Sequence, residues 1–219
     1  MKKRLFYVLA ALPVAAVIVI FGIHLLQENE DPIASKEGRE TQTAERFIRV
    51  DPKTDDKKLS QLFEEMGIVQ MDDPVPIPVE IQLTDLKGKS VSFSEFKGKI
   101  LFVNFWATWC PPCREEMPSM EKLHARLKQK DFIMLAVDLM EPASKVEAFF
   151  QEFKLTFMAL LDSNGEIGSL FGIRSIPTTL IMDKNGMIIG IAVGPRDWAG
   201  KKSIALFEYL IDREVELNS

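Results

Sequence analysis

Cysteine and histidine are scarce in this sequence, which has two of each among its 219 residues. A tetrahedral zinc site needs about four ligands, whereas the chain offers two neighbouring thiols with His124 far away in sequence. The composition therefore argues against a zinc site. Two thiolates are enough for Cu(I), so a copper-carrying protein stays open as an alternative to thiol chemistry.

Positive charge is also in short supply. The chain has 27 Lys and Arg residues against 32 Asp and Glu residues, for a formal net charge of −5. Three of the positive residues are Lys2, Lys3 and Arg4 at the N-terminus, so the rest is more acidic still. An acidic domain repels phosphate groups, and we expect no nucleic-acid partner.

Residues 5–26 contain no Asp, Glu, Lys or Arg. As a helix this run would be roughly 33 Å long, enough for a hydrocarbon core of about 30 Å. The basic residues at 1–4 predict a cytoplasmic tip and a single-pass anchor in a bacterial inner membrane. The C-terminal domain would then lie in the periplasm or an equivalent extracytoplasmic space. A signal peptide is the competing interpretation, and the lack of a cysteine after the run excludes a lipoprotein anchor.

The next segment, residues 27–73, is polar, of mixed charge and without strand-like runs, which predicts a tether. Within it, apolar residues at helical spacing predict a short helix at 57–66. We expect this helix to lie on the domain surface rather than to dock a partner. Prolines then alternate with apolar residues and predict a stiff, extended approach to a domain at 74–214.

Hydrophobic patterning over the rest of the chain alternates strands with helices. Strands are predicted at 80–83, 90–93, 100–105, 132–137, 157–161, 178–182 and 187–193. Helices are predicted at 114–130, 144–153 and 197–211, with Ser144 and Asp197 as N-caps. A further short helix is predicted to end at residue 171. This order predicts an α/β fold, a central mixed β-sheet flanked by helices.

The two cysteines occupy the corner between a predicted buried strand and a predicted helix, in the stretch Trp109-Cys110-Pro111-Pro112-Cys113. Unpaired N–H groups and the positive end of the helix dipole favour a thiolate there. Cys110 is nearer the corner, where it can be exposed, and is the candidate nucleophile. Cys113, one turn in, is the resolving thiol. Pro111 and Pro112 stiffen the loop and remove N–H donors.

These residues carry a resemblance. Residues 104–118, together with Gly172 to Thr179, resemble membrane-anchored thiol–disulfide oxidoreductases of the TlpA/ResA group, in the AhpC/TSA–Redoxin class. The similarity covers roughly residues 76–210. It implies a thioredoxin-like fold with an added N-terminal β-hairpin and a cis Ile176–Pro177 bond facing Cys110 and the substrate. From the residues alone, a trans bond at a strand start fits equally well.

Two further positions refine the site. Thioredoxins carry a buried Asp six residues before the first cysteine, where this chain has Asn104, which cannot take a proton. In ResA-like proteins a Glu three residues past the second cysteine tunes the thiols, and the resemblance gives that role of proton partner to Glu116. Its alternative is a solvated helix residue. We expect Trp109 to shield Cys110 and Trp106 to pack internally.

The resemblance implies reduction of disulfides in exported proteins, including apocytochrome c in cytochrome c maturation. It also implies an electron donor in the membrane of the CcdA/DsbD type, and no cofactor beyond a redox-active Cys110–Cys113 disulfide. The alternative is a thiol peroxidase of the AhpC/TSA class. Such enzymes place a Thr three residues before the reactive cysteine, where this chain has Ala107, with Thr108 one position late.

Overall fold

The computed structural model of the chain describes residues 56–77 and 81–213. The cytoplasmic tip predicted at 1–4, the membrane span predicted at 5–26 and the first part of the predicted tether lie outside the described residues. Among the helices that are described, none combines the length and the apolar character needed to cross a bilayer.

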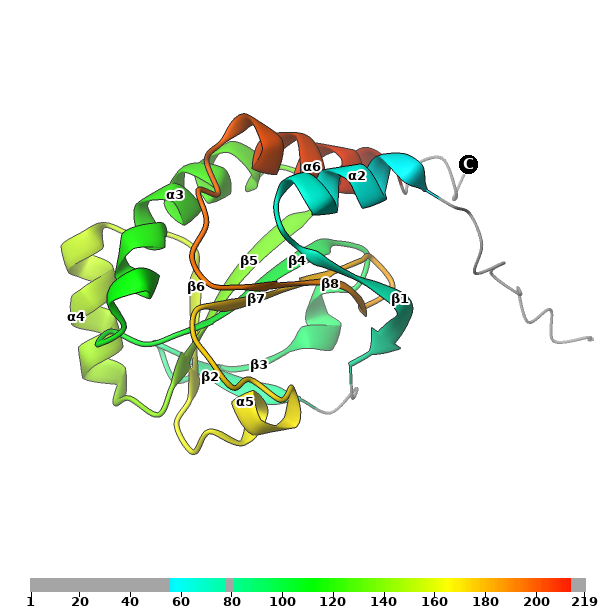
Figure 1. The fold of residues 1–219 in the computed structure, drawn as a ribbon. Coiled ribbons are helices and arrows are strands. Elements are labelled where there is room, and N and C mark those ends of the chain that lie inside the picture. The colour runs from blue at the N-terminus through cyan, green and yellow to red at the C-terminus, as the bar shows by residue number, and fades with distance from the viewer. Residues whose placement is uncertain (1–55, 78–80, 214–219) are drawn as a thin grey trace, which may run out of the picture. The chain divides into compact units, whose positions relative to one another are not determined.

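The described strands form a single mixed sheet of eight strands in the order β1-β8-β7-β4-β5-β6-β2-β3 (Figure 1). Their bounds are β1 Val69–Pro76, β2 Gln82–Asp85, β3 Ser90–Ser92, β4 Ile100–Trp106, β5 Phe132–Leu139, β6 Met158–Asp162, β7 Thr178–Met182 and β8 Met187–Val193. The added hairpin is β2–β3, and it joins the sheet through antiparallel pairing of β2 with β6. The predicted central mixed sheet is therefore confirmed.

Strand β4 lies at the centre of the sheet. It pairs in parallel with β5 and antiparallel with β7, and all of its residues are buried. Alternate residues point to opposite faces of a strand, so Ile100 and Phe102 join one apolar cluster while Leu101 and Val103 join the other. A continuous apolar run is what a strand covered on both faces requires.

The helices cover the two faces unequally (Figure 1). Their bounds are α2 Lys57–Glu65, the 3₁₀ turn η1 Phe93–Phe96, α3 Pro111–Leu127, α4 Ala143–Phe153, α5 Glu166–Leu170 and α6 Lys201–Arg213. Buried residues of α2, α3, α4 and α6 share one apolar cluster, whereas η1 and α5 pack on the other face. The parallel units β4-α3-β5 and β5-α4-β6 step the same way across the sheet, so right-handed crossovers place α3 and α4 on the same face.

The tether prediction is wrong for its C-terminal part. The helix predicted at 57–66 is present as α2. It lies on the domain surface as expected, with most of its residues exposed, while Leu59 and Phe63 pack into the core. Residues 69–76 form edge strand β1, antiparallel to β8, so ordered structure begins well before residue 74. Polar residues and prolines do not exclude an edge strand, because one of its sides makes no ladder bonds.

Two predicted helix starts are also wrong. Helix α4 has Pro142 rather than Ser144 at its N-cap, and no side chain caps it. Asp197 does not cap α6, which begins at Lys201. Its carboxylate instead accepts from the Ala199 amide in a preceding turn. Local sequence cannot tell such a turn from a cap, because both place an Asx oxygen on a nearby N–H.

Replacement of Phe63 by Ala tests whether α2 is part of the domain. Phe63 is 1% exposed and would leave a cavity, so we expect the free energy of unfolding to fall by about 3–5 kcal/mol. Urea unfolding of the isolated domain, followed by circular dichroism, measures it. Glu64→Ala, at an exposed neighbouring position, is the control and should leave stability nearly unchanged. Equal stabilities for the two variants would contradict the packing of α2.

Candidate active site

The two cysteines lie where β4 ends and α3 begins. Cys110 is the N-cap of α3, and its Sγ accepts a hydrogen bond from the Cys113 amide at 3.3 Å. Pro111 and Pro112 occupy the first positions of the helix and have no N–H. The Cys113 amide is therefore the first N–H of the helix able to face Cys110, and it is the local backbone donor to the Cys110 sulfur.

Cys110 and Cys113 form a disulfide with an S–S distance of 2.09 Å and a Cα–Cα distance of 5.3 Å. Cys110 is 3% exposed and Cys113 is fully buried. The expectation of an exposed Cys110 is therefore wrong for the disulfide form, although Cys110 is the more accessible of the two. Trp109 is 66% exposed and presents its indole to solvent beside the disulfide, while Trp106 is buried in the core as expected.

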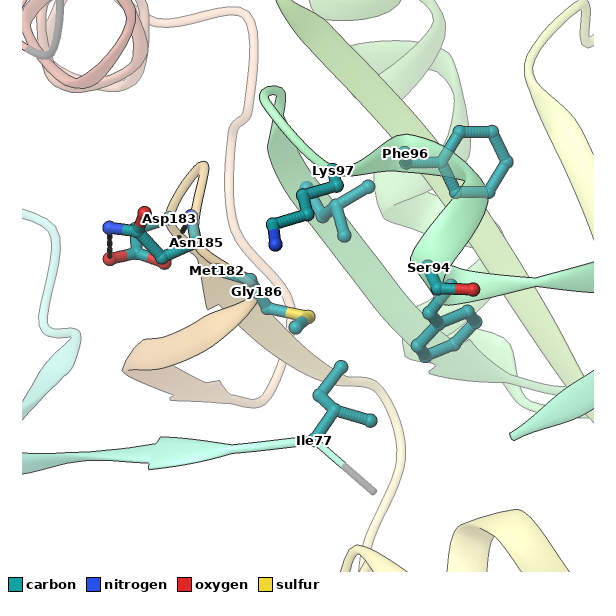
Figure 2. Close-up of a pocket in the computed structure, with 10 residues that line it drawn as sticks. Ile77, Ser94, Phe96, Lys97, Met182, Asp183, Asn185 and Gly186 are labelled. Carbon is teal, nitrogen blue, oxygen red and sulfur yellow. Dashed lines mark hydrogen bonds between the residues drawn. The ribbon is translucent and has the colours of Figure 1, made fainter. Parts of the chain in front are cut away.

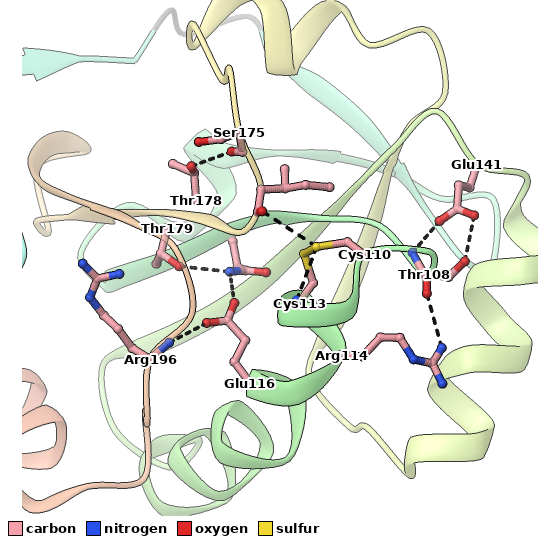
Figure 3. The surroundings of a disulfide bond; sticks show 12 residues. Thr108, Cys110, Cys113, Arg114, Glu116, Glu141, Ser175, Thr178, Thr179 and Arg196 are labelled. Atoms are coloured by element: carbon pink, nitrogen blue, oxygen red, sulfur yellow. Dashed lines mark hydrogen bonds between the residues drawn. A yellow bond between two sulfur atoms is a disulfide. The ribbon is translucent and has the colours of Figure 1, made fainter.

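Pro177 reaches the cysteines through the pairing of β4 with β7. Because Phe105 pairs with Thr178, the residue before β7 lies beside the end of β4, where the cysteine loop starts. The Ile176–Pro177 bond is cis, as the resemblance implies. The Ile176 carbonyl oxygen lies 3.8 Å from Cys110 Sγ (Figure 3). The β4–β7 register thus places the Ile176–Pro177 backbone opposite the Cys110 sulfur.

Asn104 links the centre of β4 to helix α3. Strand alternation places Asn104 on the same face as Phe102, the face covered by α3. Its Nδ2 donates to Glu116 Oε1 at 2.9 Å and to Thr179 Oγ1 at 3.0 Å (Figure 3). The Asn104 amide is therefore a hydrogen-bond donor to Glu116 and Thr179. It cannot serve as a proton acceptor in catalysis, as expected for Asn in place of Asp.

Glu116 is not a solvated helix residue. It is 2% exposed, and its Oε2 accepts from the Trp198 indole Nε1 at 3.0 Å and from the Arg196 amide at 3.1 Å. Burial raises the pKa of Glu116 to about 7, although these donors and Asn104 oppose the shift. The carboxyl can therefore gain and lose a proton near neutral pH, one helical turn past Cys113. Glu115 is exposed, as expected.

Trp198 and Arg196 are site residues that the sequence does not reveal. They lie 82 and 80 positions from Glu116, in the segment between β8 and α6, and no local motif connects them to it. Arg196 also donates from its guanidinium to the carbonyl oxygens of Met66 and Gly67 after α2. The end of α2 is thereby hydrogen-bonded to the segment that binds Glu116.

Two surface hollows have different relations to this site. One is lined by Glu115, Glu116, Ser119, Pro195, Arg196 and Asp197, and it gives the buried carboxyl a path to water. The other lies between Ile77, Phe96 and Met182, with Lys97 at its rim (Figure 2). Leu101 and Met182, which pair at the start of β4, place this second hollow at the end of the sheet away from the disulfide.

The family model described as Redoxin matches residues 70–206. The chain belongs to the Redoxin family. The matched range contains both cysteines, Glu116, Pro177 and Trp198, and it begins within β1 rather than at residue 74. The whole site described above therefore lies within the matched Redoxin domain.

Curated relatives of this Redoxin chain include thiol–disulfide oxidoreductases named ResA. The chain is 37% identical over 135 residues to ResA of Geobacillus kaustophilus (strain HTA426), covering 62% of this chain and 76% of that protein. It is 40% identical over 107 residues to ResA of Bacillus thuringiensis subsp. konkukian (strain 97-27), covering 49% of this chain. In that second alignment the chain spans 62% of the relative's length.

Solved structures agree on the fold of this Redoxin domain. The crystal structure of a thiol:disulfide interchange protein of the thioredoxin family from Chlorobium tepidum TLS gives a TM-score of 0.56 at 28% identity, covering 64% of this chain and 97% of that one. StoA from Bacillus subtilis gives a TM-score of 0.52 at 28% identity, covering 59% of this chain and 98% of that one. The thioredoxin-like fold is thereby confirmed.

Glu116→Gln should change how stability depends on pH. The pKa of Glu116 in the folded chain is about 7, above its ordinary 4.5, so the folded chain binds the extra proton between these values. Stability should fall as pH rises through this window. Gln cannot titrate, so the fall in the free energy of unfolding between pH 5 and pH 8 should be smaller in the variant by roughly 2–3 kcal/mol. Urea unfolding at both pH values measures this difference.

The matched control for that experiment is Glu115→Gln, which removes the same charge from an exposed neighbouring position. It should leave the pH dependence as in the unmodified chain. A Glu116→Gln variant that kept the full pH dependence would show that Glu116 titrates normally.

Proposed function

We propose that the protein is a thiol–disulfide oxidoreductase that uses Cys110 and Cys113 to reduce disulfides of exported proteins. The observation that carries the proposal is the Cys110–Cys113 disulfide at the N-terminus of α3, with Ile176 and Pro177 opposite it. Similarity to ResA proteins supports the same chemistry. The dithiol form is the one that acts as reductant.

The reaction passes through a mixed disulfide. The Cys110 thiolate attacks one sulfur of the substrate disulfide, forming a bond to that sulfur and expelling the other as a thiolate. Cys113, as thiolate, then attacks Cys110 Sγ, which releases the first substrate sulfur and forms the Cys110–Cys113 disulfide. Two electrons pass to the substrate, and its two expelled thiolates take up two protons from solvent. Cys110 acts first because it is the N-cap, accepts the Cys113 amide and is the more accessible sulfur.

Glu116 is the proton partner in this scheme. Cys113 must lose its proton before it attacks, and an acceptor is most effective when its pKa lies near the working pH. The pKa of Glu116, raised to about 7 mainly by burial, meets that condition. The hollow lined by Ser119 and Arg196 then lets the proton reach solvent.

Substrate binding uses the surface around the disulfide. Trp109, the residue before Cys110, is exposed and offers an aromatic surface, and the Ile176 carbonyl oxygen lies 3.8 Å from Cys110 Sγ. A polypeptide passing between them would bring its own disulfide against Cys110. Tryptophan combines a large apolar area with few rotatable bonds, so its contacts cost little entropy.

The N-terminal sequence supports an extracytoplasmic setting for the proposed function. The uncharged run at 5–26 after Lys2, Lys3 and Arg4 supports a single-pass anchor that leaves the domain outside the cytoplasm. In an oxidising compartment the dithiol has to be regenerated, and a membrane dithiol protein of the CcdA/DsbD type would supply the electrons. Apocytochrome c, with a pair of haem-site cysteines, is the proposed substrate.

Loss of either cysteine should have a distinct effect. Cys110→Ser removes the attacking sulfur, so the domain should no longer accelerate insulin reduction by dithiothreitol in a turbidity assay. Cys113→Ser keeps the attacking sulfur but cannot resolve the intermediate, so a mixed disulfide with substrate should accumulate on non-reducing gels. An unchanged rate for Cys110→Ser would rule out this proposal.

Topology and direction of electron flow can be tested together. In intact spheroplasts a membrane-impermeant maleimide should label Cys110 and Cys113, because the domain faces outward and its thiols are kept reduced. Labelling should be lost when the donor's thiols are blocked. No labelling before chemical reduction would indicate an oxidised pair, and labelling only after lysis would place the domain in the cytoplasm.

A further inference from the structure

A second buried carboxylate contacts the loop in front of the nucleophile. Glu141 lies between β5 and α4 and is 5% exposed. Its Oε2 accepts from the Thr108 amide at 2.6 Å, and its Oε1 accepts from the Thr108 hydroxyl at 2.8 Å (Figure 3). Thr108 is two residues before Cys110, so both of its donors are bound by one carboxylate close to the reacting sulfur.

The sheet explains why these residues meet. Parallel strands β4 and β5 pair Trp106 with Asp138 near their ends, so the loops that follow them leave the same edge side by side. The loop after β4 must turn into α3, and its amides have no partner strand there. A partly buried amide needs an acceptor, and Glu141 supplies it.

The opposite side of Thr108 is bound as well. Arg114 on α3 donates from Nη1 to the Thr108 carbonyl at 3.3 Å. Its guanidinium lies 5.0 Å from the Phe149 ring and 4.9 Å from the Phe153 ring, both on α4. The amide, hydroxyl and carbonyl of Thr108 are therefore all bound, and the residue is fixed between the β5–α4 loop and α3.

Asp138 completes the network beneath Glu141. It is fully buried, and its Oδ1 accepts from the Glu141 amide at 3.2 Å. Among the described residues its Oδ2 has no hydrogen-bond partner, and an ionised carboxylate left in that position would be costly. Burial, with Glu141 next, raises the pKa of Asp138 to about 8. A protonated Asp138 has an O–H to donate, and the neighbouring Glu141 carboxylate can accept it.

We propose that Glu141 is a positioning residue for the nucleophile: by holding Thr108 it fixes where Cys110 Sγ lies relative to Ile176 and the Cys113 amide. This proposal deepens the proposed oxidoreductase function and rests on it. Glu141 itself touches neither cysteine in the described contacts. Asp138 lies behind it and fixes the Glu141 backbone, because Asp138 Oδ1 accepts from the Glu141 amide.

The other charged groups around the pair leave this arrangement pH-sensitive. Lys145 on α4 is 3.9 Å from Glu141 Oε1, but its side chain is 66% exposed. The Asp162 carboxylate on β6 accepts from the amides of Ile167 and Gly168. The Arg114 guanidinium on α3 donates to the Thr108 carbonyl and lies 3.7 Å from the Glu152 carboxylate. None of these offers Asp138 a buried counter-charge, so its ionisation above about pH 8 should set two carboxylates against each other and loosen the hold on Thr108.

The test uses the reduced domain and three readouts that do not require substrate turnover. They are hydrogen exchange of the Thr108 amide, its proton chemical shift as a function of pH, and alkylation of Cys110 by iodoacetamide in a Cys113→Ser background. Glu141→Gln keeps one acceptor oxygen but places an NH2 group against the other of the two Thr108 donors. We expect at least a tenfold loss of amide protection and at least threefold slower alkylation at pH 7. Glu147→Gln, at an exposed position on α4, should change neither.

Two more variants separate positioning from charge. Thr108→Val removes the hydroxyl donor but leaves the Glu141 side chain unchanged. Like Glu141→Gln, it should slow alkylation of Cys110. This variant also carries the test if Glu141→Gln does not fold. We expect the Thr108 proton shift of the unmodified chain to change near pH 8. Asp138→Asn keeps a donor but cannot ionise, so it should abolish that change.

The outcomes distinguish this proposal from the oxidoreductase function. Insulin reduction that fails in the unmodified domain would overturn the function, whereas the Thr108 readouts would still report on the network. A folded Glu141→Gln variant with full Thr108 protection would overturn the positioning role. Thr108→Val with unchanged alkylation, or a Thr108 shift independent of pH in the unmodified chain, would also overturn it.

Discussion

The antiparallel pairing of β4 with β7 is the constraint on which the site depends. It aligns Phe105 with Thr178, and that register brings the Ile176 carbonyl to 3.8 Å from Cys110 Sγ. A shift of one residue would turn every β7 side chain to the opposite face and would move Pro177 along the strand. The register is well determined, because both strands are buried throughout and each face of the sheet has its own apolar cluster.

Around that register the chain arranges two buried carboxyl systems on either side of the cysteine helix. Glu116 lies on the buried side of α3, where Asn104, Trp198 and the Arg196 amide donate to it. Glu141 lies at the end of β5 and binds the loop before Cys110. Both carboxyl groups gain their properties from exclusion of water, which makes each hydrogen bond count more and an unpaired charge costly. One is suited to moving a proton, and the other to holding a backbone still.

Much of the sheet could be predicted from sequence because its signals are local. The apolar run before Trp109 predicts a central strand, the patterning predicts strands at 178–182 and 187–193, and the resemblance implies the cis bond at Pro177, all as observed. The predictions that were wrong concerned polar segments and the edge of the sheet. Strand β1 has too little apolar pattern to be recognised, since pairing with β8 rather than burial makes it a strand.

By itself the sequence determined the chemistry: two thiols, three residues apart, at a strand-to-helix corner, with a carboxyl one turn further on. That information is local, because helix geometry and proline stereochemistry act over a few residues. The tertiary structure alone decided what the carboxyl does, through Trp198 and Arg196, and what holds the loop, through Glu141 and Asp138. The hydrogen bonds of Glu141 to Thr108, and of Arg196 and Trp198 to Glu116, join residues between 33 and 82 positions apart, and only the packing of strands and helices sets which distant side chains share a dry environment.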